Sequence, residues 1–66
     1  REAFVIEFKV AKDFGQLDER ADEALRQIAD RRYDMELRND GYKCISYYGI
    51  AFCGKECVVH CRPCAA

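Results

Sequence analysis

The sequence predicts a small α/β domain, with a three-stranded mixed sheet, one long helix and one short helix. Three observations support this class: residues 1–12 alternate apolar and polar positions, residues 13–40 are rich in charge, and residues 44–64 hold two extended segments and every cysteine. The chain has 66 residues, half of them apolar and 35% charged, with a formal net charge of −1. This length allows one domain with a small core, and the near-neutral charge excludes a generally basic protein that coats nucleic acid.

The first strand is expected at about residues 3–11. Phe4, Ile6, Phe8 and Val10 recur at period two, which predicts one apolar core face. The opposite face carries Val5, Glu7 and Lys9. Aromatic and β-branched residues dominate the segment, as is typical of strands.

A long helix is expected at about residues 16–31 and a short one at about residues 34–39. Residues at three- and four-residue spacing form one apolar stripe on the long helix: Leu17, Ala21, Ala24, Leu25 and Ile28. Beyond the stripe, Tyr33 and Leu37 lie on a different helical face, which predicts a bend before the short helix. Gly41 is suited to the left-handed conformation that ends a helix.

Two further strands are expected at about residues 44–52 and 57–61, joined by a turn around Gly54 as an antiparallel hairpin. The connection through the helices favours parallel pairing between the first and second strands. The first strand then keeps a free edge beside an apolar face, so we expect a homo-oligomer through that edge. No stretch has the length of a membrane span or the pattern of a signal peptide, so we expect a cytoplasmic protein without membrane contact.

The tripeptide Glu7-Phe8-Lys9 is the sharpest chemical feature of the chain. In a strand, Glu7 and Lys9 point the same way, about 7 Å apart along the chain. A carboxylate can hold Mg²⁺, and a neighbouring lysine can neutralise a phosphate or orient the attacking water. By itself the tripeptide is common, and for these three residues alone an ordinary surface ion pair is the favoured interpretation.

The wider pattern resembles one family. The similar stretches are residues 4–12 (FVIEFKVAK), 21–28 (ADEALRQI), Tyr33, 39–43 (NDGYK) and 48–52 (YGIAF). They resemble the C-terminal part of the PD-(D/E)XK nuclease superfamily domain that follows an AAA-ATPase-like domain in many bacterial proteins. The resemblance implies that Glu7 is an acidic Mg²⁺ ligand and Lys9 the catalytic lysine. It also implies that Gln27 and Tyr33 support the site or contact DNA, and that the intact domain acts on nucleic acid.

The sequence also departs from the family pattern. The family's first metal-binding aspartate precedes the strand before Glu-x-Lys, and the chain starts at Arg1 without a methionine, as a piece of a longer protein would. We therefore predict the C-terminal fragment of a metal-dependent nuclease-like domain that is inactive by itself, because one carboxylate leaves most Mg²⁺ ligands to water. The alternatives are a binding or regulatory module in which Glu7 and Lys9 form an ordinary ion pair, and a small interaction module stapled by zinc.

The zinc alternative depends on a cluster of possible ligands: Cys53, Cys57, His60, Cys61 and Cys64. Cys61 and Cys64 have the Cys-x-x-Cys spacing of zinc sites and reactive dithiols. The spacing of the other cysteines is not typical of zinc sites, and the family has no zinc site here, so ordinary packing of the thiols is the favoured interpretation.

Arginines supply a second possible contact for phosphate. Arg26, Arg31 and Arg32 are expected to supplement Lys9 and Lys12 as a phosphate-facing patch, although acidic residues are interspersed among them.

Overall fold

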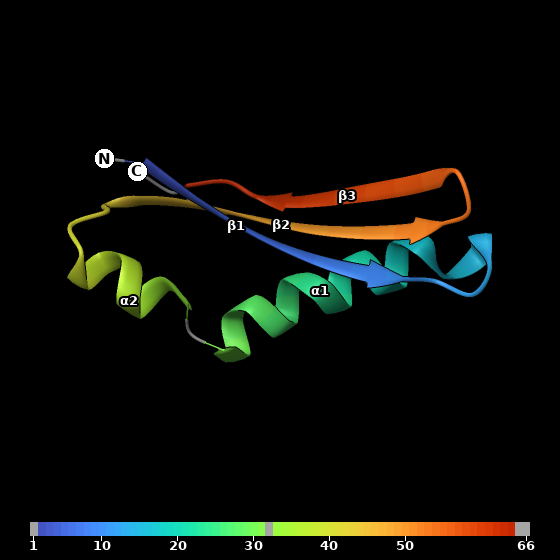
Figure 1. The fold of residues 1–66 in the computed structure, drawn as a ribbon, viewed down its shortest axis with the longest axis horizontal. Coiled ribbons are helices and arrows are strands. Elements are labelled where there is room, and N and C mark those ends of the chain that lie inside the picture. Colours follow the sequence, from blue (N-terminus) through green and yellow to red (C-terminus); the bar gives the residue numbers. More distant parts are fainter. Residues whose placement is uncertain (1, 32, 65–66) are drawn as a thin grey trace.

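The computed structural model describes residues 2–31 and 33–64. Its elements, in chain order, are β1 (Glu2–Val10), a 3₁₀ turn (Phe14–Gln16), α1 (Leu17–Arg31), α2 (Tyr33–Asn39), β2 (Cys44–Cys53) and β3 (Glu56–Arg62) (Figure 1). The α/β class and the order strand, long helix, short helix, hairpin are therefore confirmed. Neither helix within the described residues is long and apolar enough to cross a membrane.

The three strands form one mixed sheet in the order β1-β2-β3. β1 runs parallel to β2, and β2 runs antiparallel to β3, as the sequence predicts. The register places Glu7 beside Gly49 on β2, and Gly49 beside His60 on β3. Among the described residues, β1 has a strand on one side only, so its outer edge is free.

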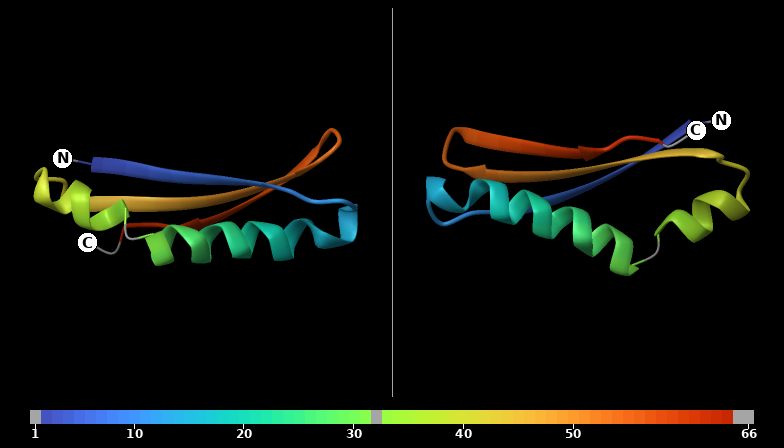
Figure 2. Two further views of the ribbon diagram at one scale, coloured as in Figure 1. Left: turned by 60° about the horizontal axis from the view of Figure 1, so that its bottom comes forward. Right: turned by 180° about the vertical axis from the view of Figure 1, so that it is seen from behind.

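α1 packs along one face of the sheet and contacts all three strands (Figure 2). The apolar stripe of the helix is buried as expected, with Ala21 and Ala24 at 0% exposure and Ile28 at 1%. The closest approach is at Gly49, where an added Cβ would lie 2.3 Å from the carbonyl oxygen of Ala21 and 2.9 Å from the backbone nitrogen of Leu25. The helix backbone therefore rests directly on β2, and only glycine leaves room for it.

The apolar face predicted for β1 is not the core face. Phe4 is 60% exposed, Phe8 59% and Val10 80%, whereas Val5, Glu7 and Lys9 lie half-buried on the side of α1. Alternation separates the two faces of a strand but does not say which one a helix covers. Here the small residues Gly49 and Ala51 of β2 admit α1 on the Glu7 side.

We call the uncovered side the open face of the sheet. Its larger apolar side chains come from all three strands: Phe4, Ile6, Phe8, Val10, Tyr48, Ile50, Phe52 and Val59. The Phe4 ring lies 6.0 Å from that of Tyr48, and the Phe8 ring 5.8 Å from that of Phe52. The open face is thus an apolar surface rich in aromatic rings, and α1 of the described residues packs on the opposite face.

Two glycines shape the connections as the sequence predicts. Gly41 takes φ 97° two residues after the end of α2, where its N–H donates to the carbonyl of Arg38 and the N–H of Tyr42 donates to that of Leu37. This pair of hydrogen bonds is a Schellman motif, which satisfies the last carbonyls of the helix. Gly54 takes φ 60° in the two-residue turn between β2 and β3.

The contact at Gly49 can be tested by adding one methyl group. We expect Gly49→Ala to lower the free energy of unfolding by about 3 kcal/mol, because neither the helix backbone nor the sheet can move aside without loss of packing. Urea unfolding followed by circular dichroism measures the change. Gly15→Ala is the matched control: its added Cβ meets only the Asp13 carboxylate at 3.3 Å, and we expect a change of about 0.5 kcal/mol or less. Equal stability of the two variants would contradict the close approach.

Candidate functional site

Glu7 and Lys9 lie side by side on the face of β1 that α1 covers. Glu7 pairs with Gly49 and Lys9 with Ala51 in the parallel register, so both side chains emerge beside the line along which the helix rests. The Glu7 side chain is only 18% exposed. Lys9 makes no ion pair with any residue of the described ranges, which leaves its ammonium available. The Glu7–Lys9 ion pair expected for a non-catalytic module is therefore absent.

The partner of Glu7 is Arg31, the last residue of α1. Arg31 Nη1 donates to Glu7 Oε1 at 3.1 Å and lies 3.1 Å from Tyr33 Oη at the start of α2. The hydrogen bond to Tyr33, followed by the charges of Tyr33 and Glu7, raises the pKa of Arg31 above its ordinary value. One guanidinium thus links β1, the end of α1 and the start of α2.

Gln27 lies one helical turn before Arg31, on the same flank of α1. Its Oε1 is buried and has no hydrogen-bond partner among the described residues. Buried polar atoms are normally hydrogen-bonded, so an unsatisfied amide oxygen marks a place where a ligand or water is expected. The four-residue spacing places Gln27 on the same flank of α1 as Arg31, which contacts Glu7, and Tyr33 lies beside Arg31 at the start of α2.

A shallow groove runs between the N-terminal half of β1 and α2. Its lining includes Glu7 and Tyr33 from the candidate site and two further carboxylates, Glu36 and Asp40. These acidic residues do not converge: within residues 2–31 and 33–64, no three His, Cys, Asp or Glu side chains are grouped closely enough to hold a metal ion. Within the same described ranges, Glu7 is the one carboxylate that forms an ion pair with Arg31.

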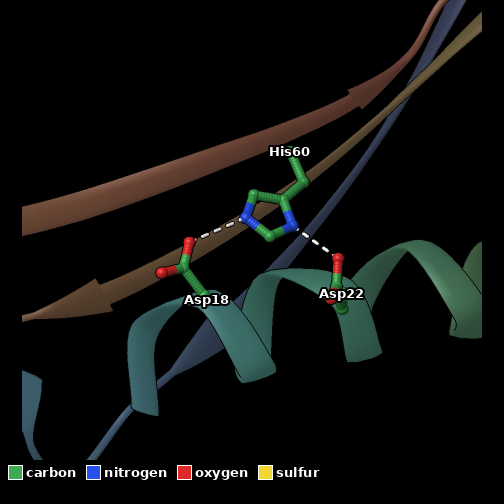
Figure 3. A network of polar contacts seen from close by, with 3 residues as sticks. All are labelled: Asp18, Asp22 and His60. Carbon is green, nitrogen blue, oxygen red and sulfur yellow. Dashed lines mark hydrogen bonds and ion pairs between the residues drawn. The ribbon is translucent and has the colours of Figure 1, made fainter. Parts of the chain in front are cut away.

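The other flank of α1 carries a second polar cluster. The imidazole of His60 on β3 lies between two carboxylates of α1, with Nδ1 2.5 Å from Asp22 Oδ1 and Nε2 2.9 Å from Asp18 Oδ1 (Figure 3). The hydrogen bond to Asp18, then that to Asp22, raises the pKa of His60 above its ordinary value despite some burial. A ring with both nitrogens paired to carboxylates is most stable as the imidazolium, so His60 acts as a cationic clamp between β3 and α1.

The structure does not bring the five predicted zinc ligands together. His60 is engaged by Asp18 and Asp22, and Cys64 forms a disulfide with Cys44, with the two Cα atoms 5.4 Å apart. Cys57 and Cys61 are exposed on the open face, whereas Cys53 packs against the core on the side of α1. Contact with Cys61 raises the pKa of the Tyr48 hydroxyl.

The expected arginine patch is divided between the two flanks of α1. Arg31 faces β1, but Arg26 lies beside Asp22 and Arg62 on the flank toward β3. Arg32 lies outside the described residues. Sequence reasoning grouped Arg31 with the phosphate-facing cations and missed its contact with Glu7, because the two residues are 24 positions apart and no local spacing connects them.

These features define a class: an α/β domain that presents Glu-x-Lys on a strand beneath a helix bearing glutamine and arginine, with a tyrosine at the start of the next helix. A family model described as the PD-(D/E)XK nuclease superfamily matches residues 1–61. The chain belongs to this superfamily, as its resemblance to the family implies. The searches of curated proteins and of solved structures found no match.

The clamp predicts a pH dependence of stability. Because folding raises the pKa of His60, its contribution is complete below about pH 6.5 and is lost as the pH rises through the raised value. We expect wild-type protein to exceed His60→Gln in unfolding free energy by about 0.5–1 kcal/mol at pH 6, and by less at pH 9. Urea titrations at both pH values measure this difference. The exposed Glu56→Gln variant should follow the wild-type trend, and a wild-type advantage that grows with pH would contradict the clamp.

Proposed function

We propose that this chain supplies the Glu-x-Lys part of a metal-dependent nuclease site that hydrolyses phosphodiester bonds of nucleic acid. The observation that carries the proposal is the position of Glu7 and Lys9, together on one face of β1 within a chain of the PD-(D/E)XK superfamily. Within residues 2–31 and 33–64, the Lys9 ammonium forms no ion pair and the buried Gln27 Oε1 accepts no hydrogen bond, and both observations support the same assignment.

The oxygen donors of this flank fit Mg²⁺ in kind. Glu7 offers a hard carboxylate, and the buried amide oxygen Oε1 of Gln27 has no hydrogen-bond partner in the part of the chain that the structure describes. Mg²⁺ is commonly held by one or two carboxylates, with water and substrate phosphate as its other ligands. When bound, Mg²⁺ would supply Lewis-acid polarisation of the phosphate and a more acidic water. Glu7 is the residue that would hold it.

The remaining residues act by position and charge. The Lys9 ammonium neutralises negative charge that develops on the phosphate and orients the attacking water. Gln27 donates its amide N–H groups or accepts with Oε1 at the same flank, and the Tyr33 hydroxyl, already tied to Arg31, lies at its end toward α2. This arrangement binds and orients, and among the described residues Glu7 is the one carboxylate that it offers to the metal.

We therefore propose that the chain by itself cleaves nucleic acid weakly or not at all. With Glu7 as the one acidic ligand, most of the coordination of Mg²⁺ falls to water, and the attacking water is poorly fixed. The pairing of Glu7 with Arg31 favours a second candidate function, a binding module in which the carboxylate serves structure rather than catalysis. The association with an AAA-ATPase-like domain and the cytoplasmic location stay predictions.

Metal binding separates the two candidates. We expect the chain to bind Mn²⁺, measured by electron paramagnetic resonance, and Glu7→Gln to weaken that binding by about tenfold or more, because it removes a charged ligand. We also expect no Mg²⁺-dependent nicking of plasmid DNA above background. Binding of Mn²⁺ that is unaffected by Glu7→Gln would contradict the metal-site assignment. Nicking that is lost on Lys9→Ala would contradict the proposed inactivity.

We further propose that two or more copies of the chain associate through the free edge of β1 and the adjoining open face. An unpaired edge strand offers a row of backbone donors and acceptors, and the neighbouring aromatic surface gains from burial. β1 supplies four of the exposed apolar side chains of that face, at positions 4, 6, 8 and 10.

Light scattering after size-exclusion chromatography tests this association. We expect the wild-type chain to elute as a dimer or larger species and Phe8→Lys to shift it toward the monomer, because the charge lies on the open face beside the edge. Phe14→Lys is the matched control, since Phe14 is 65% exposed but lies outside the sheet. A clean wild-type monomer at high concentration would contradict the proposal.

A further inference from the structure

The contact between Arg31 and Glu7 has a chemical consequence for cation binding. A guanidinium and a divalent cation compete for the same carboxylate, since both are attracted to its oxygens. Arg31 Nη1 lies 3.1 Å from Glu7 Oε1, so the carboxylate is already neutralised in this structure. A cation that binds Glu7 must displace or share this contact.

The two partners differ in exposure, and the difference indicates which one moves. The Glu7 side chain is 18% exposed and belongs to the middle of a nine-residue strand, whereas the Arg31 side chain is 53% exposed and stands at the end of its helix. Glu7 is therefore fixed by the sheet. Arg31 has a long side chain in solvent that can leave without disturbing the core.

The second contact of Arg31 keeps the guanidinium nearby. Tyr33 Oη lies 3.1 Å from the same Nη1 atom, on the first residue of α2. If the contact with Glu7 is lost, the contact with Tyr33 holds the positive charge at the end of the flank where the candidate site lies. The guanidinium thus has two contacts, and one of them, Glu7, is the proposed ligand of a cation.

We propose that Arg31 is a positioning residue that occupies the cation's place on Glu7 and yields it when a divalent cation binds. This inference rests on the proposed metal site at Glu7 and adds a competitor to it. Arg31 then sets the cation affinity of the site. It lowers the affinity at Glu7 for as long as the guanidinium stays in contact with the carboxylate.

The sign of the effect distinguishes competition from a merely structural role. We expect Arg31→Met to tighten Mn²⁺ binding by about two- to fivefold, the range that corresponds to loss of a partly exposed ion pair. Loss of a structural support would weaken binding instead. Arg31→Lys keeps the charge and should restore an affinity close to that of wild type. Electron paramagnetic resonance of Mn²⁺ with the 66-residue chain measures all three affinities.

Arg26→Met is the matched control, because Arg26 belongs to the same helix but lies on the flank toward β3, beside Asp22 and Arg62. It should leave Mn²⁺ affinity unchanged. Far-UV circular dichroism confirms that each variant is folded. The double variant Glu7→Gln/Arg31→Met should show no gain over Glu7→Gln, since no carboxylate remains to be released.

The Mn²⁺ measurements distinguish a wrong metal site at Glu7 from a wrong role for Arg31. If Glu7→Gln does not reduce Mn²⁺ binding, or if neither wild type nor Arg31→Met binds Mn²⁺, the metal site itself is wrong and the competition falls with it. If Glu7→Gln abolishes binding but Arg31→Met leaves the affinity unchanged or lower, the metal site stands and the role of Arg31 is overturned.

Discussion

The close contact between α1 and Gly49 is the constraint on which the rest of the structure depends. Gly49 stands between Glu7 and His60 in one row across the sheet, and the helix backbone lies directly above it. Gly49 places no side chain beneath the helix. Its neighbours on β1 and β3 therefore lie along the two flanks of α1. Glu7 meets Arg31 on the β1 flank, and His60 meets Asp18 and Asp22 on the β3 flank.

On the two flanks of α1, the helix and the sheet exchange the roles of cation and carboxylate. On the β3 flank the sheet provides the cation and the helix two carboxylates, which hold both ring nitrogens of His60. On the β1 flank the sheet provides the carboxylate and the helix one solvent-exposed guanidinium. The first arrangement ties the helix to the sheet. The second places the Glu7 carboxylate beside a guanidinium that is half exposed to solvent. The stabilising clamp and the candidate site thus lie on opposite flanks of the same helix.

Local patterns predicted the three strands and the two α-helices. The stripe at Leu17, Ala21, Ala24, Leu25 and Ile28 identified the buried side of α1, and Gly41 identified the end of α2. The alternation in β1 gave two faces but not their roles, because Gly49, which admits the helix, is 42 residues from Glu7 in the chain. The sequence did not predict the Arg31–Glu7 pair or the Cys44–Cys64 disulfide, for the same reason. They are long-range contacts that no spacing within one segment encodes. The Glu-x-Lys tripeptide and the family resemblance pointed to Glu7, but neither pointed to its contact with Arg31.

The Cys44–Cys64 disulfide gives the hairpin a property that its hydrogen bonds do not. It joins the first residue of β2 to the segment after β3 and makes the whole hairpin one covalent ring, with the cysteines 20 positions apart. Closing a loop of this size removes conformational freedom worth about 3 kcal/mol from the unfolded chain. Gly49 and His60 both lie inside the ring. The strand position against which α1 packs and the cationic clamp therefore stay close together even when the helix unfolds. A reducing environment would therefore loosen the docking of α1 through a bond that touches neither the helix nor Glu7.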